Sequence, residues 1–350
     1  MKFMHISDLH LGKRVNEFSM LEDQKDILRK ILKIADEEKS QALLIAGDVY
    51  DKSIPTVEAI QLFDDFLCEL SKRKVQTFII SGNHDSAERM AFGGRLMKES
   101  VVYVAPVYAG KTQAVVLEDE WGSINIYLLP FVKPANVKRF FEDEQIENYT
   151  DAIRVAVEQM KLNTDERNVL VTHQFVTGAK RSESEDISVG GTDNVDASVF
   201  DAFDYVALGH IHGPQKIGRE TVRYCGTPLK YSFSEIHHKK SVTIVEMKEK
   251  GNVEISTKEL APLRDWCEMK GTYMELTEKA YYENLDQDSY MHITLTDEED
   301  IPEAVRKLQV IYPNLMKLDY DNQRTRGKAA FLEAAEAEEK TPFDIFEELY

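Results

Sequence analysis

Five short polar motifs, each directly after a short apolar run, set the strongest limit on how this chain folds. They are Asp8-Leu9-His10, Gly47-Asp48, Gly82-Asn83-His84-Asp85, His173 and Gly209-His210-Ile211-His212. A short apolar run that ends at a turn signal is typical of a buried strand. Functional side chains gather at strand ends in α/β proteins, because the strand is rigid and the following loop is free to vary. The motifs therefore predict an α/β fold in which five strand ends carry the functional side chains.

The segments between the motifs alternate between helical and strand periodicity. We expect helices at 19–39, 56–74, 86–99 and 150–162, and strands at 2–7, 42–46, 75–81, 101–104, 113–117, 124–129, 168–172, 205–208, 222–224 and 241–247. The polar, glycine-bearing segment 178–196 is expected to be a long loop, and loops of that length are usually functional. The two glycines at 93 and 94 weaken the helix expected at 86–99.

The pattern changes near Pro262. A strand at 290–296, a helix at 302–311 and a strand at 315–320 form a plausible small α/β unit. A chain of 350 residues also fits two domains. We therefore divide it into a main domain at 1–260, a small domain at 261–325 and an acidic, helix-prone tail at 326–350.

The net charge of −19 argues against simple nucleic-acid binding, because phosphate contacts need Lys and Arg. The charge is unevenly distributed: residues 241–350 hold 13 basic and 25 acidic side chains, and residues 1–240 hold 30 and 37. The first part can therefore still present a local basic face. The three scattered cysteines fit a reducing compartment, and no apolar signal region or membrane-spanning run occurs in the sequence. We expect a cytoplasmic protein that does not enter a membrane.

The motifs supply imidazoles, carboxylates and one amide oxygen, and no thiolate. This set suits divalent ions such as Mn²⁺, Fe²⁺ or Zn²⁺. Seven candidate ligands exceed the need of one ion: Asp8, His10, Asp48, Asn83, His173, His210 and His212. Two ions about 3.5–4 Å apart can clamp the attacking and the leaving oxygen of a phosphoryl displacement. If the segments are extended, residues two apart point to the same side, so Asp8 with His10, and His210 with His212, would each grip a common ion.

The ordered motifs resemble those of the calcineurin-like metallophosphoesterase superfamily, which are D-x-H, G-D, G-N-H-D/E, H and G-H-x-H. Within it, the chain is similar to the SbcD nuclease family. That closer similarity depends on residues 5–12 (HISDLHLG), 189–193 (VGGTD) and 224–233 (YCGTPLKYSF). The resemblance implies a four-layer metallophosphoesterase β-sandwich flanked by helices, followed by a small C-terminal α/β capping domain.

The resemblance also implies a role for each motif residue. Asp8, His10, Asp48 and His212 would bind one ion, and Asp48, Asn83, His173 and His210 would bind the other. His84 would face the scissile phosphate, where it stabilises the transition state or protonates the leaving oxygen. Asp85 would orient the His84 ring. Asp51 is a weaker candidate for support of the site.

The implied activity is Mn²⁺-dependent exonuclease and endonuclease cleavage of DNA by two metal ions, in DNA repair, recombination and replication. The implied partner is an SbcC-type coiled-coil ATPase, which would bind near the tail at 326–350. The alternatives are a small-molecule phosphodiesterase or phosphomonoesterase with the same site, and a scaffold that has lost catalysis. Retention of all seven ligands argues against the scaffold.

Several basic residues lie near the motif loops, either as phosphate contacts for DNA or as ordinary surface charge: Lys13, Arg14, Lys52, Arg89, Arg95, Lys180 and Arg181. Apolar residues of the segments 56–74 and 86–99 are either core or, as the resemblance implies, a homodimer surface: Phe63, Leu67, Met90, Phe92, Leu96 and Met97. The remaining histidines are interpreted as structural (His5, His292) or as part of a solvated loop (His237, His238).

Overall fold

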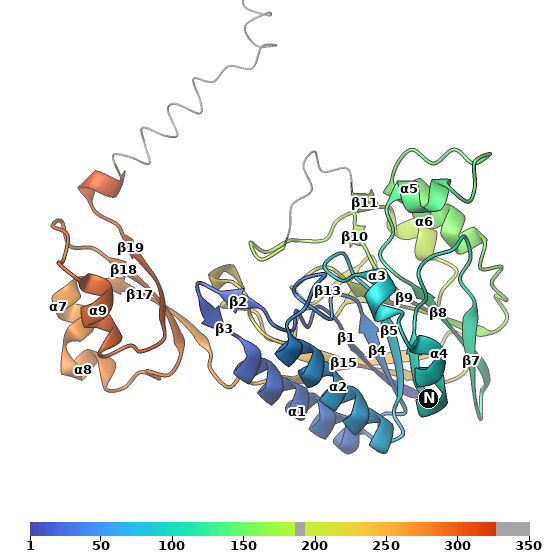
Figure 1. Ribbon diagram of the computed structural model, residues 1–350, viewed down its shortest axis with the longest axis horizontal. Coiled ribbons are helices and arrows are strands. Elements are labelled where there is room, and N and C mark those ends of the chain that lie inside the picture. Colours follow the sequence, from blue (N-terminus) through green and yellow to red (C-terminus); the bar gives the residue numbers. More distant parts are fainter. Residues whose placement is uncertain (186–192, 327–350) are drawn as a thin grey trace, which may run out of the picture. The chain divides into compact units, whose positions relative to one another are not determined.

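The computed structural model describes residues 1–185 and 193–326, and the chain divides into two compact units, Met1–Leu263 and Arg264–Tyr350 (Figure 1). Residues 189–192 of the VGGTD motif and nearly all of the expected tail lie outside the described residues. The subdivision into a capping domain and a tail stays a prediction. Within the described ranges, no helix has the length and apolar character that crossing a membrane requires.

The first sheet of unit one has six strands in the order β16-β15-β1-β4-β5-β6. Four of them are parallel: β1 (Lys2–Ile6), β4 (Ala42–Ala46), β5 (Gln76–Ile80) and β6 (Val102–Val104). The antiparallel strands are β15 (Ser241–Met247) and β16 (Val253–Glu259). Helix α1 (Leu21–Glu38) joins β1 to β4, and helix α2 (Val57–Lys72) joins β4 to β5.

The second sheet also has six strands, in the order β13-β14-β12-β9-β8-β7. Its parallel strands are β8 (Gly122–Leu129), β9 (Arg167–His173), β12 (Tyr205–Gly209) and β14 (Arg219–Tyr224). The strands at its two edges, β7 (Ala114–Asp119) and β13 (Gln215–Ile217), are antiparallel to their neighbours.

An apolar core joins the two sheets face to face. Leu44 and Phe78 of the first sheet pack in one buried cluster with Ile126, Val171 and Ala207 of the second. On the opposite face of the second sheet, helix α6 (Tyr149–Glu158) packs in a separate cluster with residues of β8, β9 and β12. Helices α1 and α2 lie against the first sheet (Figure 1), and the buried face of α1 includes Ile27 and Ile31. The layers are therefore helix, sheet, sheet, helix, and the expected fold class is confirmed.

The parallel registers align the strand ends that precede the motifs. Ile6 of β1 pairs with Ile45 of β4, and Ala46 of β4 pairs with Ile80 of β5. In the second sheet Gly209 of β12 pairs with His173 of β9. The carboxyl ends of these strands therefore meet at a common edge of the sandwich.

Unit two has its own parallel sheet, in the order β17 (Trp266–Gly271), β18 (Tyr290–Leu295) and β19 (Leu315–Tyr320). Its helices are α7 (Tyr273–Thr277), α8 (Lys279–Tyr282) and α9 (Ala304–Gln309). Met269, Ile293 and Leu308 belong to its core. This is a small α/β unit, although β17, α7 and α8 were absent from the sequence-based expectation.

The expected helix at 86–99 is wrong. It is broken into α3 (Ala87–Met90), α4 (Gly94–Met97) and a 3-10 turn at Lys98–Ser100. The break is at Gly93, whose φ of 74° is left-handed. The short helix α5 (Pro134–Lys138) was also missed. In the expected loop at 178–196, β11 (Asn194–Val195) pairs in parallel with β10 (Phe175–Val176).

Candidate metal centre

The backbone at the motifs is strained rather than extended. Asp8, His10 and Asp48 have φ of 54°, 44° and 48°, and His210 has φ of 105°. Residues other than glycine rarely adopt these conformations, and such outliers cluster at functional sites. The expectation of extended segments is therefore wrong, and the directions of these side chains come from left-handed turns.

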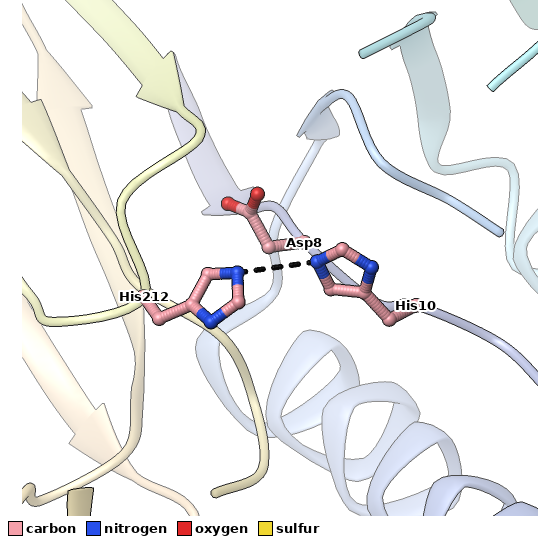
Figure 2. A group of neighbouring side chains, drawn as sticks. All are labelled: Asp8, His10 and His212. Atoms are coloured by element: carbon pink, nitrogen blue, oxygen red, sulfur yellow. Dashed lines mark hydrogen bonds between the residues drawn. The ribbon is translucent and has the colours of Figure 1, made fainter. Parts of the chain in front are cut away.

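One group of side chains consists of Asp8, His10 and His212 (Figure 2). Each offers one ligand atom, and the three atoms lie within 4.8 Å of one another. Nε2 of His10 and Nε2 of His212 are 3.2 Å apart. All three residues are buried, and the Asp8 carboxylate accepts a hydrogen bond from the backbone N–H of His210. A carboxylate and two imidazoles therefore converge from two different sheets.

The second group consists of Asn83, His173 and His210. Oδ1 of Asn83 is 2.9 Å from Nε2 of His173 and 3.0 Å from Nδ1 of His210. His210 and His212 thus point to different groups, which contradicts the expectation that they share an ion. The pairing of Asp8 with His10 agrees with it.

Asp48 lies between the two groups. Its Oδ2 is 3.3 Å from Nε2 of His173 in one group and 3.9 Å from Nε2 of His10 in the other. Burial alone would raise the pKa of Asp48, but the neighbouring imidazoles, His173 first, hold it well below its usual range. Asp48 is therefore an anion at the centre of the site.

Two glycines, Gly82 and Gly209, lie so close to Asp48 and His173 in space that a larger residue would not fit. A Cβ on Gly82 would lie 2.1 Å from Oδ1 of Asp48. A Cβ on Gly209 would lie 1.8 Å from the carbonyl oxygen of Ala46 and 2.7 Å from Nδ1 of His173. Gly209 therefore lets the two sheets approach closely, and Gly82 leaves room for the Asp48 carboxylate at the end of the neighbouring strand of the first sheet.

The hydrogen bonds of His173 show that the donor set suits a cation. Nδ1 of His173 lies 2.8 Å from the Ala46 carbonyl, which only accepts, so Nδ1 carries a proton. In the neutral ring, Nε2 then points a lone pair at Oδ1 of Asn83 and Oδ2 of Asp48, which are acceptors as well. A proton or a metal ion must lie among these atoms. Without metal the proton is favoured: burial lowers the pKa of His173, but Asp48 outweighs burial and raises it to about 9.

The buried rings of His10 and His210 are neutral. Burial lowers the pKa of His10 well below its usual value and that of His210 to about 3. Among the described residues, Nδ1 of His10 and Nε2 of His210 are buried and have no hydrogen-bond partner. Burial also raises the pKa of Asp8. Neutral imidazole nitrogens and buried carboxylates are what a divalent ion binds, so the residues fit such an ion.

His84 occupies a more open position than the six buried aspartate and histidine ligands around it. Its side chain is 23% exposed, and its Nε2 is 3.9 Å from Oδ2 of Asp48. Its Nδ1 is 3.0 Å from the backbone carbonyl of Asp51. The ring meets that of His10 edge to face, with centroids 4.8 Å apart.

The contacts of Asp85 differ from its expected role, which was to orient the ring of His84. Its two carboxylate oxygens accept the backbone N–H groups of Val49, Tyr50 and Gly82, at 2.9–3.1 Å. Asp85 therefore holds the turn after Asp48, and the ring of His84 is oriented by the Asp51 carbonyl. Burial, together with Asp48, raises the pKa of Asp85 to about 6.

The basic residues expected to bind DNA fall into two sets. Arg14, Lys52, Arg89, Arg95 and Lys180 are exposed, and Arg14 contacts Glu17. Lys13 forms an ion pair with Asp51 at 2.8 Å. Arg181 forms one with Asp193 at 2.9 Å, and its guanidinium lies 3.7 Å from the centre of the Phe175 ring. Lys13 and Arg181 therefore already have partners.

The interpretation of His5 and His292 as structural agrees with their contacts. His5 is buried against the Tyr205 hydroxyl at 2.8 Å, and His292 lies between Glu268 and Asp319. His237 is exposed, and His238 is half-buried beside Gly213. Sequence reasoning missed Ser184, Glu185 and Glu235, which contact His212. The segment at 224–233, which carries part of the family resemblance, ends two residues before Glu235.

Comparison with known proteins agrees with this geometry. The family model for calcineurin-like phosphoesterases matches residues 1–214, and the SbcD C-terminal model, described as the type 5 capsule protein repressor C-terminal domain, matches residues 259–350. A curated relative from Staphylococcus epidermidis carries the name of the SbcD subunit of the SbcCD nuclease. It is 34% identical over 325 residues, which is 91% of this chain and 85% of the relative.

Solved structures to which the chain shows similarity include a dimetal phosphatase from Danio rerio, at 14% identity and a TM-score of 0.42, covering 75% of this chain and 99% of that one. Another is the protein TT1561 of Thermus thermophilus, at 13% identity and a TM-score of 0.39, covering 73% and 98%.

Fold, donor set and family match together define a metal-dependent phosphoesterase. The chain belongs to the calcineurin-like phosphoesterase family, and within it to the SbcD branch. The resemblance inferred from the motifs is confirmed, and the family fold implies divalent metal ions.

Proposed function

We propose that this chain is a Mn²⁺-dependent DNA nuclease with exonuclease and endonuclease activity. The observation that carries the proposal is the position of Asp48 between two groups of candidate ligands, all buried except the half-buried Asn83. Asp8, His10, His212 and Asp48 would hold one ion, and Asn83, His173, His210 and Asp48 would hold the other. Two divalent ions in these positions would lower the pKa of a shared water and clamp the attacking and leaving oxygens of a phosphodiester.

His84 acts on the substrate in this proposal. Its Nδ1–H donates to the Asp51 carbonyl, which fixes the ring and leaves Nε2 on the side of the site. As an imidazolium, with Nε2 also protonated, the ring can donate the Nε2 proton to the leaving oxygen or stabilise the charge of the transition state, and it remains neutral with Nδ1–H afterwards. Asp85 supports the reaction indirectly, because it holds the turn that presents Asp48.

The proposed partners are DNA and an SbcC-type coiled-coil ATPase, in the repair and processing of DNA ends. The name of the Staphylococcus epidermidis relative and the match of a C-terminal SbcD model support this proposal. A cytoplasmic location is supported by the three cysteines, all of which lie in the described ranges and are free thiols.

The test is a cleavage assay on linear and hairpin duplex DNA, with and without Mn²⁺ and the ATPase partner. We expect Mn²⁺-dependent cleavage of DNA, and weak hydrolysis of p-nitrophenyl phosphate mono- and diesters. Efficient hydrolysis of the small esters with no cleavage of DNA would instead favour a small-molecule phosphoesterase.

Salt dependence tests the DNA contacts. Lys180 has no ion-pair partner among the described residues, whereas Arg181 is paired with Asp193. We therefore expect Lys180→Ala to reduce the slope of log binding constant against log salt concentration by about 0.9, the contribution of one phosphate contact. Arg181→Ala should leave that slope unchanged. Lys33→Ala, which removes an exposed charge on α1, is the control. An unchanged slope for Lys180→Ala would make it ordinary surface charge.

A homodimer is proposed through an apolar face formed by α2, α3 and α4. Phe92 is 82% exposed, Leu96 is 77% exposed, and Ile60 at 47% is also exposed beside a cavity lined by Phe63 and Met90. Large apolar side chains rarely gather on the surface of a monomer without a partner. Sedimentation should give a dimer for the native chain and a monomer for Phe92→Glu combined with Leu96→Glu. A native monomer at micromolar concentration would contradict the proposal.

A further inference from the structure

A polar network of the buried Glu235 and the half-buried Ser184 lies behind His212, on the side of the ring away from the other candidate ligands. Nδ1 of His212 is 2.6 Å from the hydroxyl of Ser184, and that hydroxyl also bonds Oε1 of Glu235. Glu235 ends the 3-10 turn Phe233–Glu235 and is fully buried. The opposite nitrogen, Nε2, faces His10 in the group drawn in Figure 2.

The hydrogen bonds of this network have one donor-to-acceptor direction, from His212 through Ser184 to Glu235. The Glu235 carboxylate only accepts, so the Ser184 hydroxyl must donate to it. The hydroxyl has a single proton, so it accepts from His212, and Nδ1 of His212 must carry a hydrogen. Nε2 is then left with a free lone pair that points into the metal centre.

This direction requires Glu235 to be an anion, and an ion pair with Lys240 stabilises its charge. Nζ of Lys240 is 2.5 Å from Oε2 of Glu235, and both residues are buried. Lys240 also donates to Oγ1 of Thr227 at 2.6 Å and to the backbone carbonyl of His212 at 3.0 Å.

The main chain of His212 is fixed on its other side by Glu185. The backbone N–H of His212 donates to Oε1 of Glu185 at 2.5 Å. The ring, the N–H and the C=O of this one residue are therefore each held by polar side chains. The second ligand group has a separate support, because His173 is fixed by the Ala46 carbonyl.

We infer that Ser184 and Glu235 are positioning residues, which hold His212 in its Nδ1–H form and so set the affinity of one of the two metal positions. Partners of this kind orient a ligand and raise its basicity. The inference rests on the proposed role of His212 as a ligand. It goes further in assigning the loop residue Ser184 to one ion and not to the other.

The first measurement is a titration of metal-free protein with Mn²⁺, followed by the electron paramagnetic resonance signal of free Mn²⁺. We expect two binding steps in the native chain. Ser184→Ala should weaken one step by about 10–100-fold, the usual effect of losing such a partner, and leave the other unchanged. Ser184→Thr keeps a hydroxyl and should retain both steps. Ser256→Ala, the same change at an exposed position on β16, is the matched control.

The second measurement is the tautomer of His212 in metal-free protein, by nitrogen-15 resonance at mildly alkaline pH. The native chain should show the Nδ1–H form, and Ser184→Ala should lose it. Identical tautomers and identical Mn²⁺ affinities in Ser184→Ala and the native chain would overturn the inference. A native chain that keeps the Nδ1–H form yet binds no Mn²⁺ would overturn the proposed metal centre, so the two failures are distinguishable.

Discussion

Asp48→Asn is expected to reduce phosphodiester hydrolysis to background. Asp48 is the carboxylate that lies between the two ligand groups, with Oδ2 at 3.3 Å from His173 and 3.9 Å from His10. A neutral amide cannot bridge two divalent cations as a carboxylate does. The substitution also removes the charge that raises the pKa of His173 to about 9, so that ring loses the anion that favours its protonated form.

The measurement is single-turnover cleavage of duplex DNA at saturating Mn²⁺, together with the metal content of the purified variant. Asp65→Asn makes the same change at an exposed position on α2 and should keep native activity and metal content. Circular dichroism of each variant separates loss of a metal from loss of the fold. Substantial Mn²⁺-dependent cleavage by Asp48→Asn would contradict the assignment of a bridging carboxylate.

The convergence of the five motifs could be predicted from the sequence, because it depends on local signals. Each motif follows a short apolar run that is read as a strand, and parallel strands end at the same edge. The structure places the motifs at the carboxyl ends of β1, β4, β5, β9 and β12, in that order. The short apolar runs can be recognised without knowledge of contacts between distant residues. This part of the fold could therefore be predicted from the sequence.

The directions of the side chains could not be predicted in the same way. The alternation of side chains in an extended segment placed His210 and His212 on one ion, but His210 has φ of 105° and contacts Asn83. The left-handed turn at Asp8 is held by hydrogen bonds from another strand end, since the N–H of Asp8 donates to the Gly47 carbonyl. Tertiary contacts therefore override the local pattern.

The residues that hold His212 in place were not predicted from the sequence, for a related reason. Ser184 is 28 residues before His212, and Glu235 is 51 residues after Ser184. No periodicity relates positions so far apart in the sequence. The wrong role for Asp85 has the same origin: adjacency to His84 suggested a contact, whereas its oxygens bind the backbone of Val49 and Tyr50.

His84→Gln separates catalysis from metal binding. His10, Asp48 and His84 together form one of the groups that could hold an ion, so His84 as a ligand is the competing interpretation. Its neighbour Asn83 turns toward His173 and His210, while the His84 ring turns to the Asp51 carbonyl and is more exposed. Because the side chains of Asn83 and His84 point in different directions, we interpret His84 as a residue that faces the substrate and not as a metal ligand.

We therefore expect His84→Gln to keep two ions and nearly native DNA affinity, while the rate of cleavage falls by about 10²–10⁴-fold, the usual contribution of a positioned proton donor. Elemental analysis, DNA binding in Ca²⁺ and single-turnover cleavage in Mn²⁺ give the three quantities. His237→Gln removes an exposed histidine and should match the native chain in all of them. If His84→Gln loses an ion along with its activity, His84 is a ligand, and the proton donor must be sought elsewhere in the site.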